Sequence, residues 1–208
     1  MSGDTPAFEP REISDARTMR ALTHPVRVAL IEALGVYGPM TAPEAGERLG
    51  ESPTTCSFHL RQLAKYGFVE EAGTGRGRAR PWRMTNLGLR FSSVQDDPEV
   101  EHAAIALGQL LHGRQMDRYR TWLDTRASYP RVWRDAAFYH EHVLWVTPEE
   151  LDALGRRLVE LLTSIHPERR TDPETRPPGA LPAELLAFAH PIAFPATGVA
   201  DGDAEAGS

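Results

Sequence analysis

The sequence predicts a mainly α-helical fold with a small β component, in which a compact N-terminal domain is followed by a C-terminal α+β domain. Three observations lead to this prediction. Two short capped helices follow one another within residues 41–66, a Gly- and Arg-rich hairpin follows them, and further helical and β-prone runs come after residue 97. With 208 residues and 41% hydrophobic content, the chain is long enough for one or two cores. The segments that we expect are a flexible arm over 1–13, a first domain over 14–92, a second domain over 97–195 and a disordered acidic tail over 196–208.

The first domain contains two adjacent helices with clear start and stop signals. Thr41 and Glu44 have the spacing of a capping box, so a helix begins there, and Gly50 is a natural end for it. Ser52 and the proline after it repeat the start signal, which predicts a second helix over 53–66. Two short helices joined by a tight glycine turn form a helix-turn-helix pattern.

A predicted β-hairpin follows these two helices. Residues 68–71 and 80–85 are β-prone, and the loop over 73–79 that joins them holds three glycines together with Arg76 and Arg78. Glycine allows the tip to turn tightly, and the two arginines can reach a phosphate backbone or a narrow minor groove. A helix-turn-helix followed by such a hairpin is a winged helix-turn-helix layout.

The second helix has one apolar and one polar face. Cys56, Leu60 and Leu63 follow i, i+4, i+7 spacing and should face the core, which leaves polar side chains outside. Such side chains can donate hydrogen bonds to phosphates and base edges. An ordinary solvated surface is the alternative reading of this face. Our candidate DNA-binding residues on the helix and the hairpin are Ser52, Thr54, Thr55, Ser57, Phe58, His59, Arg61, Gln62, Lys65, Arg76, Arg78 and Arg80.

Charge is distributed unevenly along the chain. The net charge is -6, which would disfavour a polyanionic partner. Residues 1–90 nevertheless carry 12 basic and 10 acidic side chains, whereas residues 91–208 carry 11 and 19. Seven of the basic residues lie between Arg61 and Arg90, and a local patch matters more to DNA than the total does.

Residues 12–90 resemble the winged helix-turn-helix regulators of the ArsR-like superfamily. The resemblance is carried by ALTHPVRVALIEAL (21–34), MTAPEAGERLGESPTTCSFHLRQLAKYGFVEEA (40–72) and GRARPWRMT (77–85). It implies a homodimer that binds a palindromic operator in double-stranded DNA, usually as a repressor. Metal-sensing members carry thiolates where this chain has Ala45, Gly46 and Glu47, so we do not expect a soft-metal switch. By position, the resemblance assigns the recognition helix to Thr54, Thr55, Ser57, Phe58, His59 and Arg61 and the wing to Arg76 and Arg78.

The second domain, over 97–195, is less clearly marked. The resemblance implies dimerisation through the long helical segment after the wing, so we expect a dimerisation domain that could also bind an effector. We predict a helix over 99–125, a strand over 142–146, a helix over 147–166 and a strand over 185–194. The LWVTPEEL step from strand to helix looks like the C-terminal extension of actinobacterial winged-helix regulators. Its aromatic residues could line a small-molecule effector pocket, although a core or a dimer interface is the commoner role. The candidate ligand-binding residues are Trp122, Trp133, Tyr139 and Trp145.

Several function classes have little support in the sequence. The one cysteine excludes a disulfide framework and a multi-thiolate metal site within one chain. His140 and His142 could share a strand face and hold a metal, but partly exposed polar residues are the more common case. We therefore expect no catalytic residues, no metal and no cofactor, and no signal peptide or membrane helix, hence a cytoplasmic protein. The alternatives that remain are a winged-helix protein-interaction module and a ligand-binding or enzymatic C-terminal domain.

Overall fold

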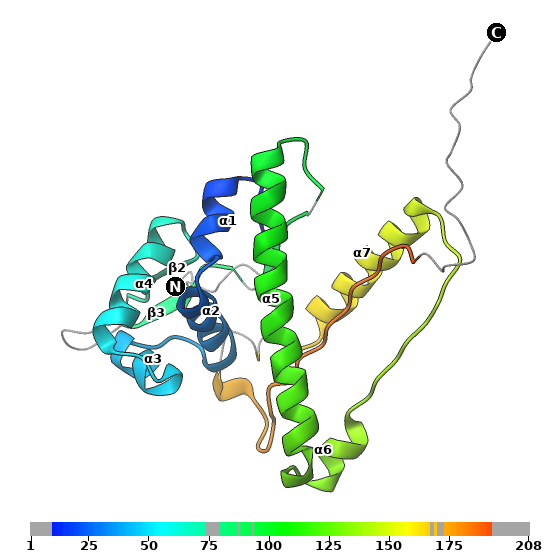
Figure 1. Cartoon of the computed structure of the whole chain (residues 1–208). Coiled ribbons are helices and arrows are strands. Elements are labelled where there is room, and N and C mark those ends of the chain that lie inside the picture. Colours follow the sequence, from blue (N-terminus) through cyan, green and yellow to red (C-terminus); the bar gives the residue numbers. More distant parts are fainter. Residues whose placement is uncertain are drawn as a thin grey trace.

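The computed structural model describes residues 10–73, 80–86, 88–92, 94–166, 169 and 173–192. Residues 1–9 of the predicted arm over 1–13, the tip of the hairpin and the acidic tail lie outside these residues. The end of the predicted arm is not flexible, because Arg11 and Glu12 form β1 and Ile13 is buried in the core. The fold is mainly helical with a small sheet component, as predicted (Figure 1). The elements in chain order are β1 (Arg11–Glu12), α1 (Ala16–Leu22), α2 (Pro25–Tyr37), α3 (Ala42–Leu49), α4 (Pro53–Lys65), β2 (Val69–Glu71), β3 (Trp82–Met84), β4 (Leu89–Arg90), α5 (Pro98–Thr125), η1 (Arg126–Ser128), α6 (Arg131–Ala136), α7 (Pro148–Ser164) and η2 (Pro173–Thr175).

The two helices of the predicted pair begin and end where their local signals place them. The Thr41 side chain accepts from the backbone N–H of Glu44, and the Glu44 carboxylate accepts from the backbone N–H of Thr41 at 2.7 Å. This reciprocal capping box starts α3. Gly50 ends α3 in the left-handed region, with φ of 69°, and the Ser52 hydroxyl accepts from the N–H of Thr55 at 3.0 Å to start α4.

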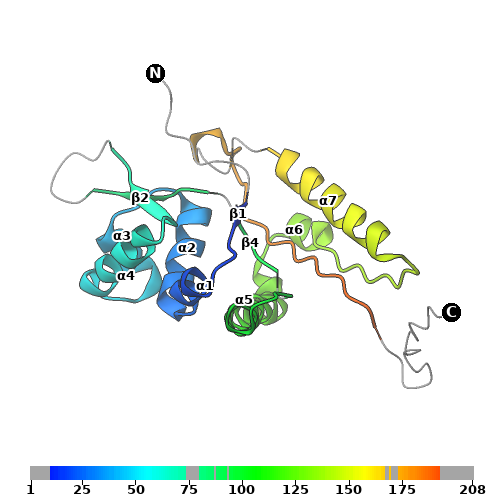
Figure 2. The ribbon, with the colours of Figure 1, turned by 90° about the horizontal axis from the view of Figure 1, so that it is seen from above.

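The predicted hairpin forms a short antiparallel ribbon beside this helix pair. β2 and β3 pair with Val69 opposite Met84, and a bridge between Met40 and Trp82 ties the ribbon to the segment before α3. β1 and β4 form a separate two-stranded parallel sheet (Figure 2). The hairpin is therefore fixed to the helix pair at its base, as the winged layout requires.

One hydrophobic core holds the N-terminal elements and the start of α5 together. Leu30, Leu60, Leu63 and Phe68 are almost fully buried in it, and α5 adds Leu107. Burial of such side chains contributes about 1.5–3 kcal/mol each. Among the described residues, none after Leu107 is buried, so the first turns of α5 belong to the N-terminal domain and the rest of the chain lies outside its core.

The C-terminal half differs from the predicted α+β domain. The two predicted helices form as α5 and α7, and α6 is an additional short helix. Residues 142–146 and 185–192, in contrast, are extended segments that pair with no strand among the described residues. A strand needs a neighbouring strand that pairs with its backbone N–H and C=O groups. α7 lies apart from α5 in both views (Figures 1 and 2). The two strand predictions are therefore not met within one chain.

The segment over 180–192 is tied to α5 and, through it, to α2. Arg118 donates to Glu184 and to Glu32 of α2, with a 2.7 Å contact to Glu32. Arg114 also donates to Glu32, at 2.6 Å. Burial raises the pKa of Glu32, but the hydrogen bonds from the two arginines outweigh it and lower the pKa below its usual value. None of the described helices combines the length and hydrophobicity that crossing a bilayer requires.

Candidate nucleic-acid interface

The outward face of α4 carries most of the predicted DNA-binding side chains. Thr54, Phe58, Arg61 and Lys65 are exposed, while Cys56, Leu60 and Leu63 are buried on the opposite side. The sequence places these residues correctly because helical spacing alone decides which side each occupies. Thr55, Ser57 and Gln62 are half-buried on the flanks, and the Thr55 hydroxyl lies 2.8 Å from the hydroxyl of Ser52 at the helix start.

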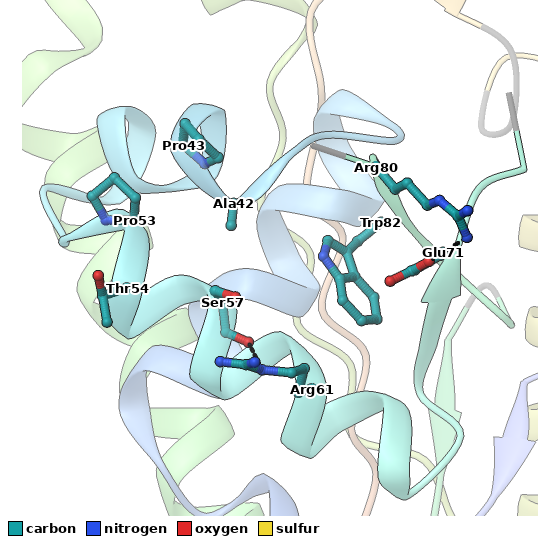
Figure 3. A pocket seen from close by; sticks show the side chains of 9 residues that line it. All are labelled: Ala42, Pro43, Pro53, Thr54, Ser57, Arg61, Glu71, Arg80 and Trp82. Atoms are coloured by element: carbon teal, nitrogen blue, oxygen red, sulfur yellow. Dashed lines mark hydrogen bonds and ion pairs between the residues drawn. The ribbon is translucent and has the colours of Figure 1, made fainter. Parts of the chain in front are cut away.

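A pocket of about 660 Å³ lies between α4, the N-terminal turn of α3 and the wing (Figure 3). Thr54, Ser57 and Arg61 form its α4 side. The wing side holds Trp82 with Arg80 and Glu71, and Figure 3 shows these residues across the pocket from α4. The remaining lining residues are Ala42, Pro43 and Pro53 at the helix starts. The pocket therefore joins both halves of the winged layout into one concave surface.

The two arginines of the pocket wall differ in whether an acidic side chain neutralises them. The Nε of Arg61 donates to the backbone carbonyl of Ser57 at 3.2 Å, and Arg61 has no acidic partner among the described residues. Arg80, in contrast, forms an ion pair with Glu71 at 3.1 Å. The N-terminal turns of α3 and α4 add partial positive charge at the pocket edge. The surface can accept an anion most readily beside Arg61.

Trp82, Ala42 and Pro43 were missing from the sequence-based candidates. Trp82 is half-buried, and its backbone pairs with Met40, which fixes the ring beside α4. The capping box at Thr41 could have indicated that the next two residues lie at an exposed helix start. Nothing in the local sequence places Trp82 there, because its position depends on pairing between segments 42 residues apart.

His59 is a correction to the predicted set. The structure buries it to 8% exposure, with its ring 4.3 Å from that of His24 at the start of α2. Burial, followed by the charges of His24 and Arg27, lowers the pKa of His59. A buried, neutral imidazole facing α2 cannot contact a base edge, so His59 supports the helix rather than its outer face.

The remaining candidates divide between positions that the structure describes and positions that it does not. Arg76 and Arg78 lie outside the described residues. Trp122 and Trp133 are half-buried and Tyr139 and Trp145 are exposed. Among the described residues, Trp122 has a ring partner in Tyr129, at 5.0 Å. No described ring contact joins the four candidates to one another, and the ligand site stays a prediction.

The other reactive side chains show no site for chemistry. Burial raises the pKa of the Cys56 thiol, which keeps it protonated inside the core. The rings of His140 and His142 stack 6.1 Å apart. Among the described residues, no group of three or more His, Cys, Asp or Glu side chains is placed to hold a metal ion.

Comparisons with known proteins agree with the helix-turn-helix geometry. Residues 22–72 match the family model described as a helix-turn-helix domain. That range spans α2, α3, α4 and β2, and of these α3, α4 and β2 line the pocket. Among curated proteins, no sequence matches the chain significantly.

Three of the similar solved structures come from proteins described as regulators, and their similarity to this chain is low. One is the homodimeric winged helix-turn-helix DNA-binding domain (fragment 1-100) of Mb0332 from Mycobacterium bovis, described as a possible ArsR-family transcriptional regulator; it is 18% identical, with 62% of this chain and 86% of that chain covered and a TM-score of 0.32. A MarR family regulator from Neisseria meningitidis, NMB1585, is 18% identical over 67% and 79%, with a TM-score of 0.32. The transcriptional regulator Tm0710 from Thermotoga maritima is 12% identical over 76% and 89%, with a TM-score of 0.29. This chain contains a helix-turn-helix domain over residues 22–72.

Proposed function

We propose that this protein is a sequence-specific DNA-binding transcriptional regulator that acts in the cytoplasm as a homodimeric repressor. In this proposal α4 enters the major groove of a palindromic operator, and the wing contacts the adjacent backbone or minor groove. The observation that carries the proposal is the pocket shared by α4, the start of α3 and the wing, with Arg61 on its wall.

The side chains on the pocket wall support a DNA partner. Its α4 side presents hydroxyl groups and a guanidinium, which donate to phosphates and base edges. Phe58 is 52% exposed on the same helix, where it can contact a thymine methyl group. A net charge of +2 over residues 1–90 favours approach to DNA, while the acidic second half points to a separate role.

Substitution of Arg61 tests the base-reading role of α4. We expect Arg61→Ala to weaken operator binding by about 1–3 kcal/mol if the guanidinium reads a guanine. The measurement is a gel-shift titration on an operator fragment that is first selected from genomic DNA. Arg120→Ala on α5, another exposed arginine, is the matched control and should leave the affinity unchanged. Equal affinity of the Arg61 variant and the wild type would remove Arg61 from the interface.

The wing arginines are tested through the salt dependence of binding. Each phosphate contact contributes about 0.9 to the slope of log affinity against log salt. We therefore expect a double Arg76→Ala, Arg78→Ala variant to show a flatter slope than the wild type. An unchanged slope would mean that the wing does not contact phosphate.

A protein-interaction module is the second candidate, and the exposed Phe58 favours it. Such a module would show no DNA affinity even at low salt, where non-specific binding is strongest. An effector or an enzymatic activity in the C-terminal half has less support, because no ring contact among the described residues joins the candidate aromatic residues to one another. A loss of activity in a His140→Ala or Glu141→Ala variant would be required to revive an enzyme.

A further inference from the structure

The chain beyond α5 exposes far more apolar surface than a self-contained domain does. α7 has no buried residue along its whole length, although its leucines recur at helical spacing. Sixteen of the 22 large hydrophobic side chains that are exposed among the described residues lie within 129–192. We call residues 137–192 the C-terminal arm.

The summed exposed apolar area of the arm is as large as the area that one partner buries in a protein interface. At roughly 100 Å² exposed per side chain, ten of its residues present on the order of 1,000 Å². A standard interface buries about 800 Å² from each partner. The ten residues are Val143, Leu144, Trp145, Val146, Leu154, Leu161, Ile165, Leu185, Phe188 and Ile192.

The pattern within residues 142–146 indicates burial on both sides. In an extended segment, Leu144 and Val146 point to one face and Val143 and Trp145 to the other. Strands that are apolar on both faces are typical of the interior of a protein. Here, however, Trp145 is 98% exposed, and the segment pairs with no strand among the described residues. Its backbone and both of its faces are open to a partner.

We propose that the C-terminal arm is a dimerisation arm, and that the same arm of a second copy of this chain buries its apolar side chains. The choice of a second copy rests on the proposed operator-binding function, which requires two α4 helices on one palindrome. A second copy is also present in equal amount whenever the chain is made. A twofold axis allows an extended segment to pair with its own copy in antiparallel fashion, so one surface can serve both subunits.

The ties between the arm and the DNA-binding domain make this interface relevant to DNA recognition. Glu184 of the arm contacts Arg118, which also holds Glu32 of α2. The ring of Phe188 lies 5.7 Å from that of His112 on α5. Joining two arms would therefore fix both α5 helices, and through them the two DNA-binding domains, at a set spacing.

Sedimentation equilibrium of the full chain tests the proposal with Trp145→Asp. We expect a wild-type dimer, and a dimer Kd that rises by at least about 100-fold in the variant, since an aromatic anchor is lost from both copies. Val94→Asp is the matched control, because Val94 is 81% exposed and lies before α5, outside the arm. This control should remain a dimer with the wild-type Kd.

Two results would overturn the proposal: a wild-type chain that stays monomeric at high micromolar concentration, or a Trp145→Asp variant that dimerises as the wild type does. A second measurement covers a variant that fails to fold. Hydrogen exchange of the wild-type amides over 142–146 should slow as concentration rises through the dimer Kd, and a rate that does not change would also contradict the arm interface. Neither readout uses DNA, so failure of the operator proposal is recognised separately, by the absence of DNA affinity in the wild-type chain at low salt.

Discussion

The buried His59, packed against His24, predicts that acid destabilises the DNA-binding domain. His59 lies on the inner side of α4, and its Nδ1 is buried without a hydrogen-bond partner among the described residues. The groups that influence it are His24 and Arg27, which oppose a positive charge, and Glu51, which favours one. Because burial is the largest effect, the pKa of His59 in the folded chain lies below its usual value of 6.5.

The direction of the pH effect follows from proton binding in the two states. Below pH 6.5 the unfolded chain binds a proton at His59 that the folded chain excludes, so the free energy of unfolding falls as the pH falls. Above pH 6.5 both states are neutral and the contribution is complete. One group can change the free energy of unfolding by at most about 1.4 kcal/mol per pH unit, and only between pH 6.5 and its folded pKa.

Urea unfolding followed by circular dichroism at pH 7.5, 6.5 and 5.5 measures this effect. His59→Leu removes the titrating group and keeps a side chain of similar size in the core. We expect the wild type to lose more stability between pH 6.5 and 5.5 than the variant does, while the other histidines act on both chains alike. Parallel pH profiles for the two proteins would refute the reasoning, since they would show that His59 titrates equally in the folded and unfolded states.

Two further substitutions test the packing that positions the interface. A Cβ at Gly46 would lie 2.6 Å from the backbone oxygen of Glu51 in the turn between α3 and α4. We therefore expect Gly46→Ala to lower the free energy of unfolding by about 1–3 kcal/mol, measured by urea titration. Gly35→Ala is the control, because a Cβ there meets no atom within 4 Å. Arg118→Met should release the arm from α5 and speed proteolysis within residues 180–192. The free energy of unfolding should fall by only about 1 kcal/mol, because the ion pairs of Arg118 with Glu32 and Glu184 are partly exposed. Unchanged proteolysis would show that other contacts hold the arm.

Local signals were sufficient for the helix pair and the hairpin of the N-terminal domain, but not for β1 and β4, whose pairing joins residues 11–12 to residues 89–90. The capping box at Thr41 and the left-handed glycine at Gly50 act within one or two turns, so their effect can be read from neighbouring residues. The helical spacing of α4 likewise predicted its buried side at Cys56, Leu60 and Leu63. The DNA contacts themselves stay predictions, which the Arg61 and wing variants test.

His59 shows where the reasoning from helical spacing was incomplete. Cys56, His59, Leu60 and Leu63 follow i, i+3, i+4, i+7 spacing, so His59 belongs to the apolar stripe rather than to its flank. Its polar ring suggested an outward position, and the histidine at the start of α2 that covers it lies 35 residues away in the chain. The spacing was the signal that could have identified it.

The C-terminal arm shows a limit of a different kind. The apolar runs at 142–146 and 185–194 have the composition of strands, yet the described parts of both stay extended and unpaired in one chain. The composition of a segment indicates that it needs hydrogen-bond partners and burial of both faces. It does not indicate which molecule supplies them. The strand predictions and the 98% exposure of Trp145 are therefore compatible if the partner is another copy. On that account the sequence describes the assembled state, and the single chain shows the same segments before their partner is in place.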